Sequence, residues 1–173
     1  MTKIRLCCTF LMVMVTLAVN AGHSWAQVIP FKSTGVNNLY DPVSMVFGGE
    51  GQTAHMGRSS GLGIAVPSPT DDPLTLNWSG AGEFEAANGD KIFFSGGGQV
   101  YLTPLGGTMF TAAWIGEFNI EGGTGRFANV GPGTAPLSVV AINHPFDIVN
   151  DPIWAYDYEI TGDMELGKKK KKK

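Results

Sequence analysis

The residues best suited to chemistry in this chain are a histidine and an arginine three positions apart, His55 and Arg58. A histidine with a pKa near neutrality can exchange protons, and a neighbouring arginine can orient an anion. No nucleophile or second base stands at a spacing that would complete a catalytic site. A surface histidine, with an arginine paired to one of the many carboxylates, is therefore the simpler interpretation. We expect these two residues to contribute at most to ligand binding.

Two glycine-rich runs could be mistaken for ligand loops. The run Gly122 to Phe127 lacks the Gly-Lys-Ser/Thr ending and the following helix of a phosphate-binding loop, so it predicts a hairpin turn that returns Phe127 to the core. Asn88-Gly89-Asp90 predicts a type I′ hairpin turn, and no acidic run has the spacing of a calcium loop. We therefore expect structural roles in turns for Gly89, Gly123 and Gly125, and we predict no metal site and no cofactor.

The two ends of the chain differ in character from the middle. Lys3 and Arg5 precede an apolar run to about Val19, and Ser24-Trp25-Ala26 then provides the small residues of a cleavage site. This pattern predicts a signal peptide over residues 1–26 and hence a secreted or periplasmic protein. A cut after Ala21 and an uncleaved membrane anchor are the alternatives. Six lysines at 168–173 are expected to be a disordered tail, either native or added.

Residues 27–167 are expected to form one domain with no transmembrane helix. Both cysteines lie in the predicted signal peptide, so the mature chain cannot contain a disulfide, a thiol nucleophile or a cysteine-bound metal. This domain has four basic residues against fifteen acidic ones, a formal charge of −11. Such a surface repels nucleic-acid phosphates and anionic lipid, so neither is expected as a partner.

The elements that would position a site are three long stretches of alternating polarity, at 74–86, 110–120 and 154–166. One face of each is apolar and the other carries carboxylates, the pattern of a half-buried strand. Each stretch is long for a strand, and glycines interrupt its apolar face, which permits strong coiling. Similar segments at 82–93 and 116–127 each read as a strand running into a glycine turn and out again. Together they predict an all-β, antiparallel, closed barrel of about eight strands built from hairpins, with little or no helix.

Weaker patterns supply the other strands and the connections. Strands are expected at 31–36, 43–47, 53–56, 92–94, 99–103 and 137–142. Irregular connections are expected at 48–51, 67–73, 131–133 and 144–152, where glycine and proline gather.

Three segments carry a resemblance to known proteins. The segments Thr53–Arg58, Ala87–Ile92 and Gly122–Gly131 resemble uncharacterised small secreted bacterial proteins, which look related in architecture to the allene oxide cyclase and dirigent barrels. Those plant families also carry a Gly-Gly-x-Gly-x-Phe turn. The resemblance implies an eight-stranded antiparallel barrel, but the families' catalytic residues cannot be matched to positions in this chain.

These observations leave several functions open. A non-catalytic binding or structural module outside the cytoplasm is favoured, because no nucleophile, metal set or cofactor motif is present. The alternative is a cyclase, an isomerase or a carrier of a small apolar molecule that uses the barrel interior. Six aromatic residues would line that interior: Trp78, Phe84, Trp114, Phe118, Tyr156 and Tyr158. Aromatics that simply fill a core are the plainer interpretation. A second alternative is a small outer-membrane barrel whose apolar face meets lipid.

Overall fold

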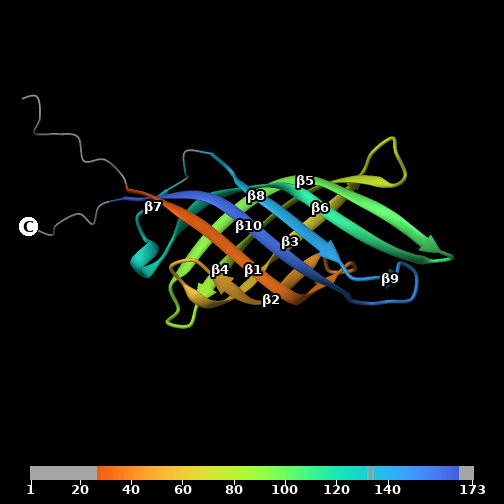
Figure 1. The fold of residues 1–173 in the computed structure, drawn as a ribbon, viewed down its shortest axis with the longest axis horizontal. Helices are drawn as coiled ribbons and strands as arrows, with labels where there is room; N and C mark the ends of the chain where they lie inside the picture. Colours follow the sequence, from red (N-terminus) through yellow and green to blue (C-terminus); the bar gives the residue numbers. More distant parts are fainter. Residues whose placement is uncertain (1–26, 132, 134, 168–173) are drawn as a thin grey trace, which may run out of the picture.

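Eight antiparallel strands close into a barrel in the computed structural model, which describes residues 27–131, 133 and 135–167 (Figure 1). The predicted signal peptide and lysine tail lie outside the described residues. The ring consists of β1 (Gln27–Asp41), β2 (Val46–Thr53), β3 (Gly57–Pro69), β4 (Thr75–Ala86), β5 (Lys91–Gly106), β6 (Met109–Gly123), β8 (Leu137–Asn143) and β10 (Trp154–Leu166). Pairing of β1 with β10 completes the closure, so the predicted fold class is confirmed.

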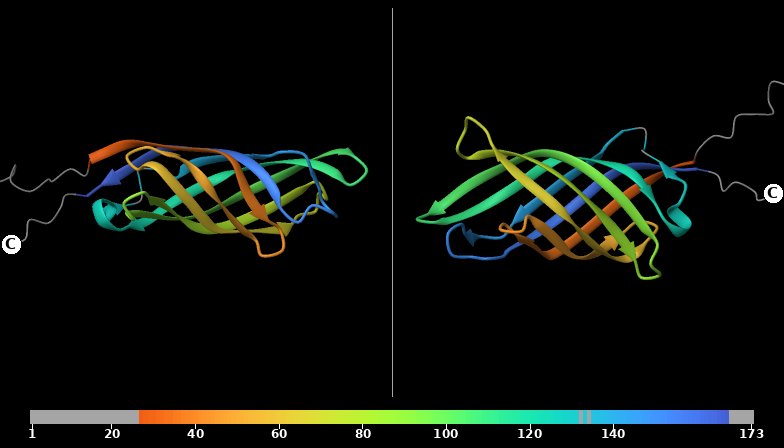
Figure 2. Two further views of the ribbon diagram at one scale, coloured as in Figure 1. Left: turned by 90° about the horizontal axis from the view of Figure 1, so that it is seen from below. Right: turned by 180° about the vertical axis from the view of Figure 1, so that it is seen from behind.

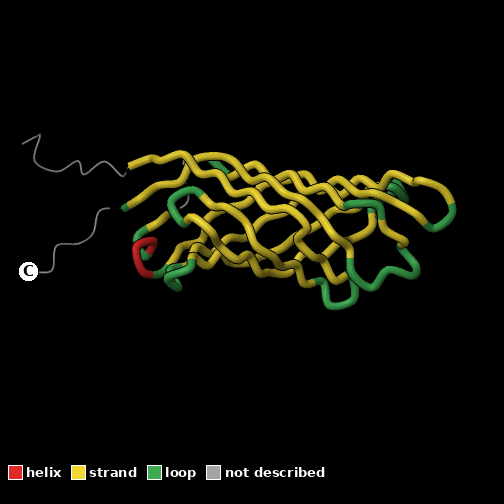
Figure 3. Tube along the Cα trace, turned by 60° about the horizontal axis from the view of Figure 1, so that its bottom comes forward, coloured by secondary structure: helices red, strands yellow, loops and turns green. Residues whose placement is uncertain are grey.

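The strands wind steeply around an elongated barrel, with the β5–β6 hairpin projecting at one end (Figures 1 and 2). The start of β1 and the end of β10 lie side by side at the other end, where a single 3₁₀ turn (Gly125–Phe127) also sits (Figure 3). Two short strands, β7 (Val130–Gly131) and β9 (Phe146–Asp147), extend the edges of β10 and β6. Among the described residues no helix has the length and apolar character needed to cross a membrane.

The apolar face of each long strand points into the barrel and the charged face points outward, as the sequence predicts. Trp78, Phe84, Trp114, Phe118 and Ile160 are buried inside the barrel. The charged residues between them, such as Glu117 and Glu159, lie on the exposed outer face. An inverted barrel, with these aromatic residues turned outward to lipid, does not match this arrangement.

The predictions for residues 43–69 were largely wrong: residues 42–45 form a turn, and the predicted strand 43–47 begins only at Val46. The glycine run 48–51 is not a connection but the middle of β2, and residues 54–56 form a turn rather than a strand. The prediction also missed β3, since its inward face carries only small residues such as Ser59, Gly61 and Ala65. Its large apolar residues, such as Leu62, are exposed on the outside, so β3 lacks the usual core pattern.

Two other predictions need correction. The segments 92–94 and 99–103 belong to one continuous strand, β5, which passes through Gly96–Gly98. A side chain at Gly96 or Gly98 would overlap backbone atoms of β6, so these glycines permit close strand contact. The second copy of the repeat does not return as a hairpin: β6 runs into the 3₁₀ turn, and its next long partner is β8.

Candidate functional site

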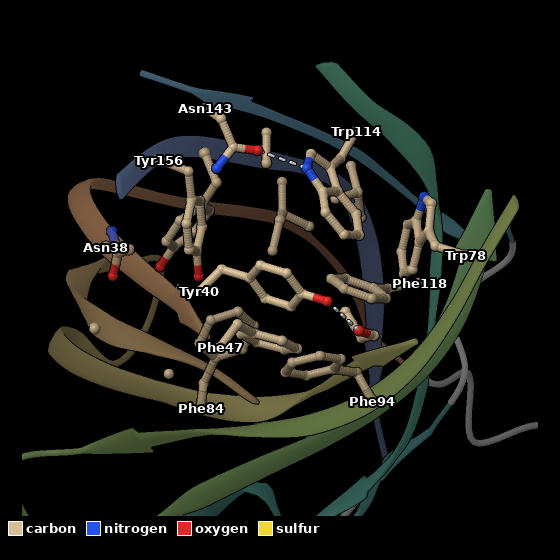
Figure 4. Close-up of a pocket in the computed structure, with 17 residues that line it drawn as sticks. Asn38, Tyr40, Phe47, Trp78, Phe84, Phe94, Trp114, Phe118, Asn143 and Tyr156 are labelled. Atoms are coloured by element: carbon tan, nitrogen blue, oxygen red, sulfur yellow. Dashed lines mark hydrogen bonds between the residues drawn. The ribbon is translucent and has the colours of Figure 1, made fainter. Parts of the chain in front are cut away.

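The interior of the barrel holds a cavity of about 80 Å³. Several water molecules or a small organic group would fit, since one water needs about 10–15 Å³. All six aromatic residues expected to line the interior do so: Trp78, Phe84, Trp114, Phe118, Tyr156 and Tyr158 (Figure 4). The main further lining residues, which the sequence analysis did not single out, are Asn38, Tyr40, Phe47, Phe94 and Asn143.

One wall of the cavity is almost wholly aromatic. The Phe94 ring centroid lies 4.9 Å from that of Phe84 and 4.4 Å from that of Phe118, which packs edge-on against Trp78 at 5.7 Å. Tilted and edge-to-face contacts at these distances are the favourable geometries for aromatic pairs. This wall, carried by β4, β5 and β6, offers an apolar, ring-shaped surface.

The opposite wall is more polar. Asn38, Tyr156 and Asn143 are direct neighbours in the register across β1, β10 and β8, and all three line the cavity. Asn143 is fully engaged, because its Oδ1 accepts a 2.7 Å hydrogen bond from Trp114 Nε1 and its Nδ2 donates to the Ala155 carbonyl. Asn38 is 2% exposed, and its Nδ2 has no hydrogen-bond partner among the described residues.

A bulge in β1 places Asn38 in this wall. Between Gly35 and Asn38, β1 advances three residues while β10 advances two, so one residue is extra. Asn37 adopts a left-handed φ of 53°, which asparagine tolerates, and its N–H donates a 2.8 Å hydrogen bond to Asp157. If β1 alternated regularly from Gly35 with no bulge, Asn38 and Tyr40 would face outward.

A chain of buried hydroxyl groups lies on the same side of the barrel. Thr53 Oγ1 is 2.7 Å from both Ser33 Oγ and Ser59 Oγ. Ser33 Oγ is also 3.2 Å from the Tyr158 hydroxyl. These contacts fix Tyr158 and leave its hydroxyl partnered.

Among the described residues, none of those that line the cavity is a carboxylate, histidine, lysine or arginine. Its titratable groups are three tyrosines. Burial raises the pKa of Tyr40 to about 12 and also raises the pKa of Tyr156 and Tyr158. All three phenols are therefore protonated at neutral pH, and the cavity can donate hydrogen bonds but presents no base.

His55 and Arg58 lie apart from this cavity. His55 is exposed in the turn between β2 and β3, with its Nε2 3.0 Å from the Pro30 carbonyl. Arg58 is on the outer face of β3, where its Nε donates a 3.0 Å hydrogen bond to Glu50. The structure does not bring either of them together with Trp78, Trp114 and Tyr156.

Of the three glycines expected in turns, Gly89 and Gly125 lie in turns, whereas Gly123 lies at the end of a strand. Gly89 lies in the β4–β5 hairpin with φ 82°, and Gly125 begins the 3₁₀ turn with φ 57°. Gly123 is the last residue of β6, without a left-handed φ, and Phe127 beyond it is buried. The described residues contain no cluster of three or more histidine, cysteine, aspartate or glutamate side chains that could hold a metal ion.

Two asparagines line the cavity that were not predicted to do so: the strand pattern contains a signal for Asn143 but none for Asn38. Asn143 continues the alternation of Leu137, Val139 and Ala141, so its inward position could have been read from the strand pattern. Asn38 shares no parity with Phe31 in the same strand, because the bulge lies between them.

Comparison with family models, with curated proteins and with solved structures gave no match. The eight-stranded barrel agrees with the architecture that the resemblance implied. No family or homologue identifies the chain as related to allene oxide cyclase or dirigent proteins.

Proposed function

We propose that this protein is a non-catalytic binding barrel that works outside the cytoplasm and holds a small, mostly apolar molecule in its interior. The observation that carries the proposal is the aromatic cavity of about 80 Å³ inside a closed barrel. Small-molecule sites are concave, mostly apolar and furnished with a few polar groups, as this cavity is. The export of the protein is inferred from the signal-like pattern of residues 1–26.

The chemistry of the lining residues favours binding over acid–base catalysis. Tyrosines with a raised pKa do not act as bases at neutral pH, and no other titratable side chain lines the cavity. Acidic residues such as Glu117, Glu159 and Asp163 lie exposed on the outer wall, and this charge disfavours anionic macromolecules as partners.

The proposal is tested with small apolar probes. The purified protein is titrated with benzene, toluene and indole, and binding is followed by calorimetry and by thermal unfolding, since a ligand that binds only the folded state raises its stability. We expect saturable binding of at least one probe. Absence of saturable binding for all three, up to their solubility limits, would overturn the proposal.

A pair of matched variants locates the bound probe. Ala141 lines the cavity, whereas Ala113 lies on the outer face of the neighbouring strand β6. Ala141→Phe fills the interior and should weaken probe binding at least about tenfold, because the phenyl ring occupies the space. Ala113→Phe adds the same group outside and should leave binding unchanged. Equal effects of the two substitutions would place the probe elsewhere.

A further inference from the structure

A second hollow lies inside the barrel, at the end from which the β5–β6 hairpin projects (Figure 1). Its volume is about 160 Å³, compared with about 80 Å³ for the cavity described above. We call the second hollow the outer chamber and the first the inner cavity. The outer chamber is walled by Met45 from the β1–β2 turn, Leu102 from the end of β5, Ile148 from the segment after β9 and Trp154 from the start of β10. It therefore lies among the connections at this end of the barrel.

Two aromatic side chains separate the outer chamber from the inner cavity. Tyr40 and Trp114 line both spaces, and their rings meet edge-on with centroids 5.2 Å apart. The Tyr40 hydroxyl donates a 3.0 Å hydrogen bond to the Ala65 carbonyl, and Trp114 Nε1 donates to Asn143 (Figure 4). Because this partition consists of side chains, it can open by a change of side-chain conformation that leaves the strand pairing intact.

The other end of the barrel is filled by side chains. Large apolar residues from the start of β1 and β5, the end of β6 and β10 and the 3₁₀ turn are each 3% exposed or less: Phe31, Ile92, Ile120, Met164 and Phe127. None of these five lines the inner cavity or the outer chamber. A closely packed interior leaves no path for a ring-sized molecule. Along the barrel, the route from solvent to the inner cavity therefore runs through the outer chamber.

The connections around the outer chamber carry exposed apolar side chains. Val43, Leu74, Leu105 and Ile148 come from four different connections at this end, and each is at least 40% exposed. Among the described residues of the connections at the other end, no large apolar side chain is exposed. An exposed apolar surface next to a hollow is typical of a ligand-binding site, because an apolar molecule gains free energy as soon as it leaves water there.

The walls of the outer chamber favour hydrocarbon groups. Apart from Tyr40, Trp114 and Trp154, the lining side chains are those of proline, methionine, leucine, valine, alanine and isoleucine. The side-chain donors of the three aromatic residues are all engaged, since Trp154 Nε1 donates to the Asp151 carbonyl. A polar group that entered the chamber would lose its water without gaining a donor, whereas the flexible Met45 side chain can adapt to an apolar one.

We propose that the outer chamber is a second binding site, for uncharged rings and short alkyl groups, and that ligands of the inner cavity enter through it. This inference rests on the proposed binding function and adds a second site and the direction of entry. The pair of Tyr40 and Trp114 then sets how fast a ligand reaches the inner cavity, and the walls of that cavity set its affinity.

Titration of the protein with benzene, followed by NMR of its methyl groups, tests both parts. The methyl groups of Leu76 and Leu102 report on the outer chamber, whose wall they form. Those of Val139 and Ile160 report on the inner cavity. A bound benzene ring shifts the signals of the methyl groups close to it, so each pair shows the occupancy of one space. We expect both pairs to shift saturably.

Matched variants of neighbouring alanines test the route. Ala112 lines the outer chamber but not the inner cavity, and Ala113 lies on the outer face of β6. Ala112→Phe should abolish the benzene-dependent shifts of Leu76 and Leu102. It should also slow benzene exchange at the inner cavity at least about tenfold and change the affinity there less than about threefold, because it fills the entrance and not the cavity. Ala113→Phe should leave shifts and exchange unchanged.

The outcomes separate the two proposals. If the inner methyl groups respond to benzene and the outer ones do not, the second site is overturned while the binding function stands. If Ala112→Phe leaves the exchange rate at the inner cavity unchanged, the route of entry is overturned. If no methyl group of either space responds up to the solubility limit of benzene, the binding function itself is overturned.

A second pair of variants covers the case in which Ala112→Phe does not fold. Ile148→Trp narrows the outer chamber from a connection outside the barrel strands and should slow exchange at the inner cavity in the same way. Val149→Trp is its control, because Val149 is 71% exposed and does not line the chamber. Equal exchange rates in these two variants would likewise overturn the route of entry.

Discussion

Trp114 gives the sharpest test of the inward and outward faces. It is 9% exposed, its ring meets that of Tyr40 edge-on at 5.2 Å, and its Nε1 donates the 2.7 Å hydrogen bond to Asn143 Oδ1. Two substitutions separate packing from hydrogen bonding. Trp114→Ala removes nearly all of both contributions, whereas Trp114→Phe removes the indole donor but keeps a six-membered ring and thus most of the packing.

The expected magnitudes follow from these contacts. Trp114→Ala should lower the free energy of unfolding by about 3–5 kcal/mol, the usual cost of truncating a buried aromatic side chain. Trp114→Phe should cost less than Trp114→Ala, about 2–3 kcal/mol, because the buried Asn143 Oδ1 loses its donor and the smaller ring loses some buried contacts. Adding Asn143→Leu to Trp114→Phe should recover part of this loss, because the orphaned acceptor is removed. The Ala155 carbonyl keeps its other hydrogen bond, from the His144 N–H.

The assay is equilibrium unfolding in urea, followed by far-ultraviolet circular dichroism, with the slope checked for two-state behaviour. Glu117→Ala, three residues along the same strand and on the exposed face, is the control and should change stability by less than about 0.5 kcal/mol. If Trp114→Ala cost less than about 1 kcal/mol, or if Glu117→Ala cost as much, the assignment of the two faces would be refuted.

Three other perturbations test local features. Gly125→Val should cost about 1–3 kcal/mol, because Gly125 has φ 57°, and an unchanged urea midpoint would contradict this. Deletion of Asn37 should cost less than about 2 kcal/mol, chiefly for the lost bond to Asp157, because removing the extra residue leaves Asn38 and Tyr40 in regular alternation with Gly35. Asn37→Gly should cost little. A loss of about 3–5 kcal/mol on deletion, the cost of exposing the Tyr40 ring, would refute the bulge argument. Hydrogen bonds, chiefly from the Asn150 side chain, lower the pKa of Asp147 to about 2. The stabilisation from the Asp147 carboxylate is therefore complete above about pH 4 and lost as pH falls towards 2. The melting temperatures of the parent protein and Asp147→Asn should differ at pH 6 and converge near pH 2; a constant gap would argue against this.

The fold class was readable from the sequence because strand periodicity is a local property. In β4, β6 and β10 every second residue is apolar, and a one-residue shift would have buried glutamates such as Glu117. Periodicity did not predict β3, because its inward face consists of small residues that fit beneath the aromatic side chains of other strands. What a strand faces is a tertiary property, so no local pattern could reveal it.

The residues of the candidate site also fall into two groups, those that the sequence predicts and those that only the tertiary structure places. The sequence by itself determined most of the aromatic wall, since Trp78, Phe84 and Phe118 follow from alternation within single strands. Within the polar wall, only the tertiary structure decided the place of Asn38, which turns inward through a bulge that is defined against β10, a strand more than a hundred residues away in the chain. A bulge reverses the facing of every residue beyond it, and its position depends on pairing between distant strands. The inward position of Asn38 is therefore one that alternation alone could not predict.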